Sequence, residues 1–377
     1  MRSEGQARLR RLVEVPVDLQ TVVEISMLPV ARSRAAAAFK EIRNQPGLNP
    51  EIDPLEAVLA GCGAPQASWS VLVSEARDRA ARALHGCHGR GGEPLTVFDS
   101  RYPALLACTP DPPPVLWVSG NVERLARPAI AIVGSRRATP YALEVAQRLG
   151  EELASRDIVV VSGLARGVDS AAHQGCLTAG GATAAILGSG LDRVYPHEHE
   201  ELAVNITKDG VLASELGPGA PPLPEHFPLR NRIISGISLA VVVVEASEKS
   251  GSLITARCAL EQGRDVMAVP GSILSGRNRG SHSLLKDGAK VVETADDILE
   301  ELGWPMSPPR ADSNCKSLAT EPLLAGMAPG EVYRLEELMA LSGLPGHRLL
   351  PRLTELELRG LITVMAGGRY VRAVGPQ

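Results

Sequence analysis

Short unbroken apolar runs recur through the middle of the chain and alternate with longer segments of helical periodicity. Unbroken runs are typical of strands that are buried on both faces, as in a parallel sheet. The helical segments between them include Pro140–Arg156, Asp169–Ala179 and Ser252–Gly263. The runs are Ala129–Val133, Ile158–Val161, Thr183–Leu187, Val211–Ala213, Leu239–Val244, Asp265–Val269 and Lys290–Val292. This alternation predicts an α/β fold built on an extended Rossmann-like parallel sheet.

The sequence on either side of this core has a different character. Residues 1–90 carry apolar residues at helical spacing and predict a helical domain. Gly61-Cys62-Gly63 could be the turn of a helix-hairpin-helix unit that contacts a DNA backbone, or the helices could form a bundle that only packs. Residues 91–304 form the α/β domain, which begins with a connector rich in glycine and proline that adds an edge strand.

The end of the chain predicts a third domain. Residues 305–321 form a linker rich in proline, serine and charge. In residues 322–377, two helical segments, Leu335–Ser342 and His347–Arg359, precede a hairpin across Gly367-Gly368. This order is typical of a winged helix, although Arg348, Arg352 and Arg359 are offset by acidic residues on the second helix. Protein contacts are as compatible with this domain as DNA-groove binding.

Glycine and small polar residues follow nearly every predicted strand of the α/β domain. Gly134-Ser135-Arg136-Arg137 follows the first run, Ser162-Gly163 the second and Gly188-Ser189-Gly190 the third. The carboxyl ends of parallel strands meet at one edge of a sheet, so these turns should lie together. Backbone N–H groups at helix starts attract anions, and arginine in the turns adds positive charge. The sequence therefore predicts a groove for a phosphate-rich ligand.

Two common phosphate ligands do not fit these turns. A dinucleotide site needs G-x-G-x-x-G in the first turn, and Gly134 has no second glycine at that spacing. The Walker motif G-x-x-x-x-G-K-[ST] is also missing, which argues against ATP hydrolysis. We therefore expect no cofactor and no metal in the groove.

Composition limits which ligands and which cellular compartment we expect for the protein. The formal charge is −4 and aromatic residues make up 3% of the 377 residues, so nucleic acid would have to bind at a local patch and without an aromatic-rich platform. No apolar run is long enough to cross a bilayer, and the N-terminus lacks a secretory signal, so we expect no membrane insertion. Six scattered cysteines without a C-x-x-C motif favour reduced thiols in a cytoplasmic protein.

Six motifs in order make the domain recognisable. They are IVGSRRATPYA, VSGLARGVDSAAH, ILGSGLDRVYP, ASELGPG with FPLRNRIISGIS, VVVEASEKSGSLITARCALEQGRDVMAVPGS and GSHSLLKDGAK. Together they closely resemble the DNA-processing protein A family (DprA, also called Smf) over about residues 95 to 295. The resemblance implies a homodimeric protein without enzyme activity that binds single-stranded DNA, protects incoming DNA and loads RecA recombinase during natural transformation.

The residues of the turns give the candidate binding site. The DNA-binding candidates are Gly134, Ser135, Arg136, Arg137, Ser162, Gly163, Arg166, Gly188, Gly190, Arg230, Asn231, Arg232, Ser250, Gly251 and Ser252. The guanidinium groups can fork onto phosphate oxygens, while serines and backbone N–H groups supply further donors. Arg230 and Arg232 could instead pair with acids inside the fold, and Arg137 could only solvate the surface.

Three further residues are expected to orient the site and not to react. We expect Asp169 to cap the helix that carries His173, and His173 to be a hydrogen-bonded packing residue. Glu245, beside a polyanion, should orient an arginine or serine partner. The rival interpretation is an enzyme, a Rossmann-like hydrolase that cleaves nucleoside monophosphates at the glycosidic bond. Its P-G-G-x-G-T segment has no counterpart here.

Overall fold

A nine-stranded sheet forms the centre of the first of two units, residues 1–309; residues 310–377 form the second. The structure is a computed structural model, and it describes residues 18–30, 37, 53–89, 91–304, 322–327, 332–358, 361–365 and 369–372. The strands are β1 (Gly92–Thr96), β2 (Val115–Gly120), β3 (Ala129–Val133), β4 (Val159–Ser162), β5 (Thr183–Ile186), β6 (Val211–Ser214), β7 (Ala240–Val243), β8 (Asp265–Ala268) and β9 (Lys290–Val291). Their order across the sheet is β1-β2-β6-β5-β4-β3-β7-β8-β9.

Strands β3 to β9 pair in parallel, and each predicted apolar run overlaps one of them; β4 and β6 extend one serine beyond their runs. β1 and β2 add an antiparallel edge, where a single strand was expected. The helices of this unit are α2 (Leu19–Ser26), α4 (Pro54–Gly61), α5 (Trp69–His88), α6 (Ala104–Ala107), α7 (Pro140–Ala154), α8 (Val168–Thr178), α9 (Glu200–Asp209), α10 (His226–Ile237), α11 (Ser252–Glu261), α12 (Arg279–Lys286) and α13 (Ala295–Glu301). The predicted α/β class is confirmed.

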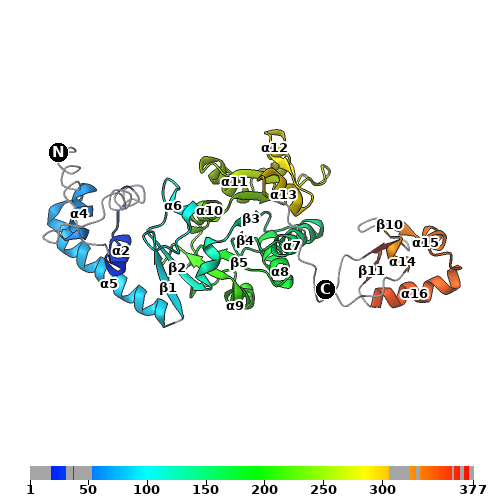
Figure 1. The fold of residues 1–377 in the computed structure, drawn as a ribbon, viewed down its shortest axis with the longest axis horizontal. Coiled ribbons are helices and arrows are strands. Elements are labelled where there is room, and N and C mark those ends of the chain that lie inside the picture. Colours follow the sequence, from blue (N-terminus) through cyan, green and yellow to red (C-terminus); the bar gives the residue numbers. More distant parts are fainter. Residues whose placement is uncertain are drawn as a thin grey trace. The chain divides into compact units, whose positions relative to one another are not determined.

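Helices cover both faces of the sheet (Figure 1). Alternate residues of β3 enter two different cores: Ile130 and Ile132 pack with α7, α8 and α13, whereas Ala131 and Val133 belong to the core that contains α10 and α11. A strand whose two faces are both covered must be apolar at every position, which is why the run 129–133 does not alternate.

Helices α7 and α8 cross unusually closely. An added Cβ at Gly150 of α7 would lie 2.5 Å from the carbonyl oxygen of Ala172, and one at Gly175 of α8 would lie 2.7 Å from the carbonyl carbon of Gln147. Because no side chain fits between these backbones, the two glycines let the helices touch. The two helices that follow the first two glycine turns are thus packed backbone to backbone.

The N-terminal helices α2, α4 and α5 share one core with the antiparallel edge of the sheet. Val22 and Ile25 of α2 and Val73 of α5 are buried in the same cluster as Leu95 of β1 and Trp117 of β2. The predicted boundary at residue 90 therefore falls inside one packed unit. The division of this unit into a helical and an α/β domain stays a prediction.

The second unit has the elements expected of a winged helix. Its helices are α14 (Pro322–Ala325), α15 (Leu335–Ser342) and α16 (Gly346–Leu358), and its sheet has the order β10 (Val332–Arg334), β12 (Arg369–Arg372), β11 (Ile362–Met365). Strand β10 was not predicted. The predicted linker 305–321, Arg359 and the turn Gly367-Gly368 lie outside the described residues. In the parts of both units that the structure describes, no helix is long and apolar enough to cross a bilayer.

Candidate functional site

A groove opens where the strand order of the sheet reverses. From β3 the chain adds β4, β5 and β6 on one side and then returns to add β7, β8 and β9 on the other. The connections that leave β3 and β7 diverge at this point, and a crevice forms at the carboxyl ends of the two strands. The groove has a volume of about 570 Å³ and is lined by Val133, Gly134, Ser135, Arg136, Arg137, Ala165, Asp169, Tyr195, Pro222, Pro224, Phe227, Pro228, Arg230, Asn231, Ile234, Ser247, Ser250, Gly251, Ser252, Ile254 and Thr255.

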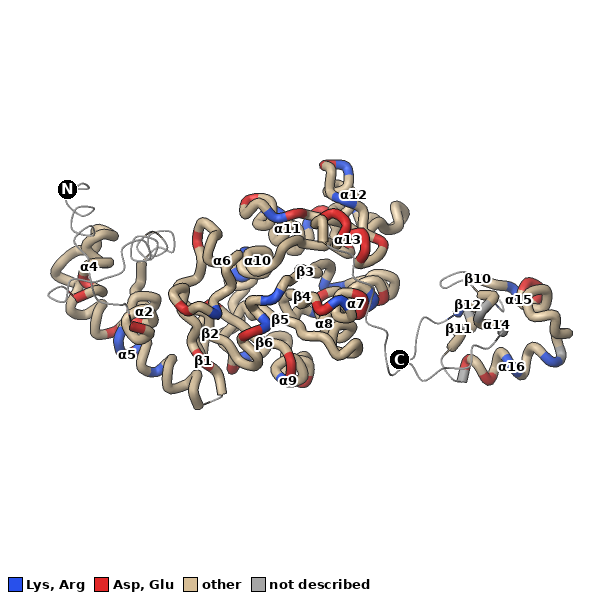
Figure 2. Tube along the Cα trace, in the orientation of Figure 1, with Lys and Arg blue, Asp and Glu red and all other residues tan. Residues whose placement is uncertain are grey.

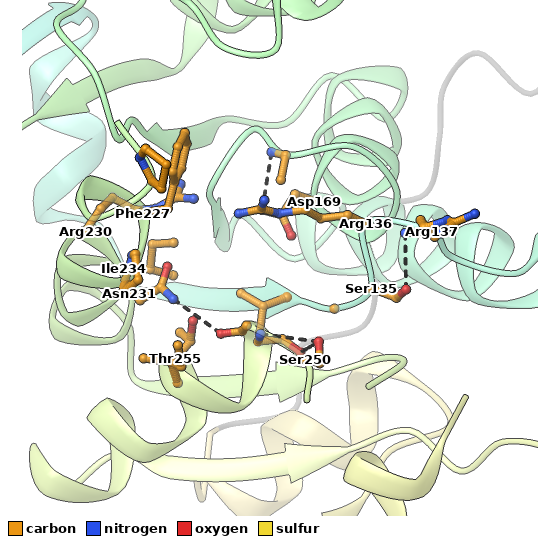
Figure 3. A pocket seen from close by; sticks show the side chains of 18 of the residues that line it. Ser135, Arg136, Arg137, Asp169, Phe227, Arg230, Asn231, Ile234, Ser250 and Thr255 are labelled. Atoms are coloured by element: carbon orange, nitrogen blue, oxygen red, sulfur yellow. Dashed lines mark hydrogen bonds between the residues drawn. The ribbon is translucent and has the colours of Figure 1, made fainter. Parts of the chain in front are cut away.

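The loop between β3 and α7 forms one wall. Arg136 and Arg137 are both exposed on it, but Arg136 points into the groove and Arg137 points away (Figure 3). The loop is anchored at its end by Thr139, whose hydroxyl donates to Oε2 of Glu245 (2.7 Å) and accepts from the N–H of Ala142 (3.2 Å). Glu245 is 1% exposed. It orients a threonine and not the expected arginine or serine, and it ties the loop after β3 to the end of β7.

Arg230 forms the floor. It comes from α10, is 6% exposed, and its Nη1 donates to the carbonyl oxygens of Gly163 (2.7 Å) and Ile186. The side chain therefore joins the carboxyl ends of β4 and β5. Burial lowers the pKa of Arg230 to about 10, and nearby Asp169 opposes the change. At neutral pH the groove thus has a fixed positive charge beneath it.

Asp169 is the carboxylate that balances this charge. Its Oδ2 accepts from the backbone N–H groups of Gly163 (3.1 Å) and Ala165 (3.4 Å). Burial raises its pKa, whereas Arg230 and the two N–H groups oppose the rise. The expectation that Asp169 caps its helix was wrong, because Gly167 occupies the N-cap of α8 and Asp169 lies in the first turn. It holds the turn after β4 in shape.

The loop between β7 and α11 forms the opposite wall. The hydroxyls of Ser250 and Ser252 are hydrogen-bonded to each other (2.7 Å), and Gly251 is the N-cap of α11. The side-chain amide of Asn231 donates to the carbonyl oxygen of Gly251 (3.4 Å), which connects the floor helix to this wall. Hydroxyls and the positive end of a helix therefore face the guanidinium of Arg136 across the groove.

Two aromatic rings in the groove were not predicted. Phe227 and Tyr195 lie with ring centroids 5.5 Å apart, and Cζ of Arg136 lies 5.3 Å from the centroid of Phe227. Phe227, Arg230 and Ile234 are spaced i, i+3, i+7 and so share one face of α10. The same spacing is present in the motif FPLRNRIISGIS, so helical periodicity is the sequence signal that places Phe227 beside Arg230.

Several candidates lie outside the groove lining; they are Ser162, Gly163, Arg166, Gly188, Gly190, Arg232, His173 and Glu245. Arg166 is exposed and forms a two-pronged ion pair with Glu198. Arg232 is 8% exposed and pairs with Glu215 (2.6 Å) and Asp111 (3.1 Å). Residues two apart on a helix point in nearly opposite directions, so Arg230 and Arg232 cannot both face the groove. Arg232 supports the fold, as the alternative interpretation had it.

The remaining candidates shape the groove from behind. An added Cβ at Gly188 would lie 2.9 Å from the ring of Phe227, and one at Gly163 would collide with the guanidinium of Arg230. The Ser162 hydroxyl donates to the carbonyl oxygen of Ile132 (2.6 Å). His173 is fully buried, with Nδ1 2.7 Å from Oγ1 of Thr183; since that hydroxyl donates to Val160, Nδ1 is the donor. Burial lowers the pKa of His173 to about 3.

The charge of the groove is local. Its lining contains three arginines and one carboxylate, whereas the rest of the trace carries both signs, with an acidic stretch at α13 (Figure 2). On α16 of the second unit, Arg348 and Arg352 lie in the first half of the helix and Glu355 and Glu357 in the second half (Figure 2). Among the described residues, no three His, Cys, Asp or Glu side chains come together as metal ligands. The site is therefore built for an anion with apolar faces, since it combines guanidinium groups with the exposed ring of Tyr195 and the half-buried ring of Phe227.

Comparison with known proteins gives a consistent result. A family model described as DNA recombination-mediator protein A matches residues 93–303. Protein Smf of Escherichia coli is 41% identical over 281 residues, which cover 72% of this chain and 75% of that protein. DNA processing protein DprA of Streptococcus pneumoniae is 44% identical over 207 residues, or 55% of this chain and 73% of that protein.

Solved structures agree. The X-ray structure of DprA from Streptococcus pneumoniae superposes with a TM-score of 0.67 at 33% identity and covers 78% of this chain and 100% of that one. DNA processing protein A from Helicobacter pylori, described for its single-stranded DNA binding mode, gives a TM-score of 0.51 at 29% identity over 56% of this chain and 95% of its own. The matched segment of the family model contains the whole groove lining, from Val133 to Thr255. The chain belongs to the DNA recombination-mediator protein A family.

Proposed function

We propose that this chain binds single-stranded DNA in the groove and acts, without enzyme activity of its own, as a mediator that loads RecA recombinase. The observation that carries the proposal is the position of Arg136. Its guanidinium lies over Phe227 and above the buried cation Arg230, inside a crevice at the carboxyl ends of the strands. A ligand here meets positive charge and an aromatic face together, which are the two features that single strands require.

The dimensions of the edge favour a chain of nucleotides over a single one. Strands lie about 4.8 Å apart, so the edge from β5 through β4, β3 and β7 to β8 extends over roughly 19 Å. Phosphates of a stacked strand recur about every 3.4 Å along its axis. The turns after several strands can therefore each contact a different nucleotide. Because most donors are hydroxyls, backbone N–H groups and guanidinium groups, sequence preference should be low.

The hydrogen bonds and burial of the two carboxylates at the site argue against the rival hydrolase. A glycosidic hydrolase needs an acid or base that can reach substrate. Asp169, the carboxylate of the groove lining that the structure describes, accepts from two backbone N–H groups, and Glu245, outside that lining, is buried against Thr139. Both carboxylates hold loops in place, which is a structural use of these residues and supports binding without hydrolysis.

The test is an oligo-dT binding titration with Arg136→Ala and Phe227→Ala. The arginine change should weaken binding to all sequences and lower the salt slope by about one unit. The phenylalanine change should cost about 1–3 kcal/mol with little effect on the salt slope, because stacking carries no charge. Arg148→Ala is the matched control, since Arg148 is exposed and pairs with Glu152 on the outside of α7.

Two outcomes would contradict the proposal. One is wild-type affinity and salt slope in Arg136→Ala. The other is release of ribose 5-phosphate from AMP by a protein that gives no gel shift with oligo-dT at low salt, which would favour the hydrolase.

Family membership supports a wider role. We propose that the protein is a cytoplasmic homodimer that protects incoming single strands and loads RecA during natural transformation. Light scattering at micromolar concentration tests the dimer, and a monomer would contradict it. Assembly of RecA on DNA coated with single-strand binding protein tests the loading step, with Arg136→Ala as the variant that should fail.

A further inference from the structure

The loop between β8 and α12, residues 269–278, stands beside the groove with two bare aliphatic side chains at its tip. Ile273 is 81% exposed and Leu274 is 92% exposed, the two highest values among the exposed large hydrophobic residues that the structure describes. Neither residue was singled out from the sequence, and the groove lining does not include them. An exposed apolar tip with polar surroundings is typical of a surface that binds something.

The base of this loop is well fastened. Asn278 is 5% exposed, and its side-chain amide donates to the carbonyl oxygen of Ser272 (3.3 Å). Nε2 of His282 lies 3.0 Å from the carbonyl oxygen of Gly271. The phenol of Tyr141 at the start of α7 donates to the carbonyl oxygen of Pro270 (3.2 Å). The tip is thus held out from a fixed base.

The loop is connected to both walls of the groove. Nη1 of Arg277 donates to the carbonyl oxygen of Arg137 (2.7 Å), which joins it to the wall after β3. Arg279 lies 3.8 Å from Glu248 of the wall after β7, and the N–H of Gly280 donates to the carbonyl oxygen of Ala246 (2.8 Å). Because β8 is next to β7 in the sheet, the loop continues the edge along which the glycine turns lie.

The charges around the tip select its ligand. Arg137, which points out of the groove, Arg277 and Arg279 are exposed, and Lys249 lies on the neighbouring loop. The acidic residues of these loops are Glu248, which faces Arg279, and Glu245, which is buried. A surface with clustered cations around two apolar side chains complements a strand whose phosphates are anionic and whose base faces are apolar.

We propose that single-stranded DNA leaving the groove crosses this loop. Arg137 and Arg277 contact its phosphates, and Ile273 and Leu274 lie against its bases. This inference rests on the proposed function and adds a second subsite to it. It also gives a ligand contact to the guanidinium of Arg137, a lining residue whose side chain points away from the groove.

The experiment compares short and long oligo-dT on the full-length protein. A strand of about 4 nucleotides spans about 14 Å, less than the edge of roughly 19 Å, whereas one of about 16 nucleotides spans about 54 Å and can reach the loop as well. The variant Ile273→Ser with Leu274→Ser should bind the short strand like wild type and the long strand about tenfold more weakly. Arg277→Ala should show the same length dependence and a lower salt slope on the long strand only. Val204→Ser, a 61% exposed aliphatic residue on α9, is the matched control.

A fluorescence measurement tests the same contact without relying on a loss of affinity. In Leu274→Trp, the long strand should quench the added fluorescence by stacking, and the short strand should not. Equal binding of the long strand by wild type and the double serine variant would overturn the subsite. So would a variant that changes the oligomeric state in light scattering while its DNA affinity stays that of wild type, since the tip would then be a protein interface. If wild type binds neither strand, the proposed function itself fails.

Discussion

Gly163 offers a way to move the buried cation of the groove without removing it. An added Cβ at residue 163 would lie 2.5 Å from Cζ and Nη2 of Arg230 and closer still to Nη1. The guanidinium group would have to leave the carbonyl oxygens of Gly163 and Ile186. Hydrogen bonds to a charged group are worth about 1.5–3 kcal/mol each, and the two carbonyl groups would be left buried. We expect Gly163→Ala to lower the free energy of unfolding by about 3 kcal/mol.

Urea unfolding followed by tryptophan fluorescence is a suitable assay. The three tryptophans, Trp69, Trp117 and Trp304, all lie in the first unit, so the signal reports that unit. Gly251→Ala is the matched control, because an added Cβ there meets no atom within 4 Å and the residue also lines the groove. The control should unfold at the wild-type midpoint.

A double-mutant cycle decides whether Arg230 carries the effect. In an Arg230→Ala background the space beside residue 163 is empty, so the added methyl group should cost under about 1 kcal/mol. The reasoning fails if Gly163→Ala unfolds at the same midpoint as Gly251→Ala. It also fails if the cost is undiminished in the Arg230→Ala background, because the clash would then involve some other atom.

Two other predictions concern the carboxylate of Glu198 and the imidazole of His173. Glu198→Gln releases Arg166 from its ion pair, so affinity for single-stranded DNA should rise several-fold at low salt. The control is Glu201→Gln, which removes an exposed acid on α9 and should give a smaller rise. Equal effects of the two changes in a binding titration would show that Arg166 is not involved. The unfolded chain binds a proton at His173 below pH 6.5, whereas the folded protein binds it only near pH 3. The free energy of unfolding should therefore decrease by about 1.4 kcal/mol for each unit by which the pH is lowered from 6.5 toward 3. His173→Gln should remove this component from the pH dependence measured by urea unfolding, and an unchanged slope would contradict the buried neutral imidazole.

The sheet was predictable because burial on both faces leaves a plain trace in the sequence. The run 129–133 has no polar position, and such a short run, preceded by Pro128 and followed by Gly134, is typical of an inner parallel strand. β1 was less visible because Pro94 interrupts it. A proline has no N–H to donate, so it is tolerated at an edge, and β1 is the edge of this sheet.

The sequence was enough to predict which turns form the candidate site, but not which of their side chains point into the groove. The turns after β3 and β7 meet as expected, since parallel strands place their carboxyl ends together. Arg166 and Arg232 share the sequence features of Arg136, yet their partners Glu198 and Glu215 come from distant segments. Only the fold reveals which cations are already neutralised. Helical spacing, in contrast, could have separated Arg230 from Arg232 and associated Phe227 with the groove.

The backbone contact between α7 and α8 limits how the groove can change shape. The turns after β3 and β4 lead directly into these two helices, which touch through Gly150 and Gly175. A hinge between them would have to separate two backbones that already meet, so both turns move as one rigid body. If the groove widens when it accepts a strand, the displacement must come from the side of α10 and α11. Pairs of spectroscopic labels on α7 and α8 should therefore keep one distance distribution with and without ligand.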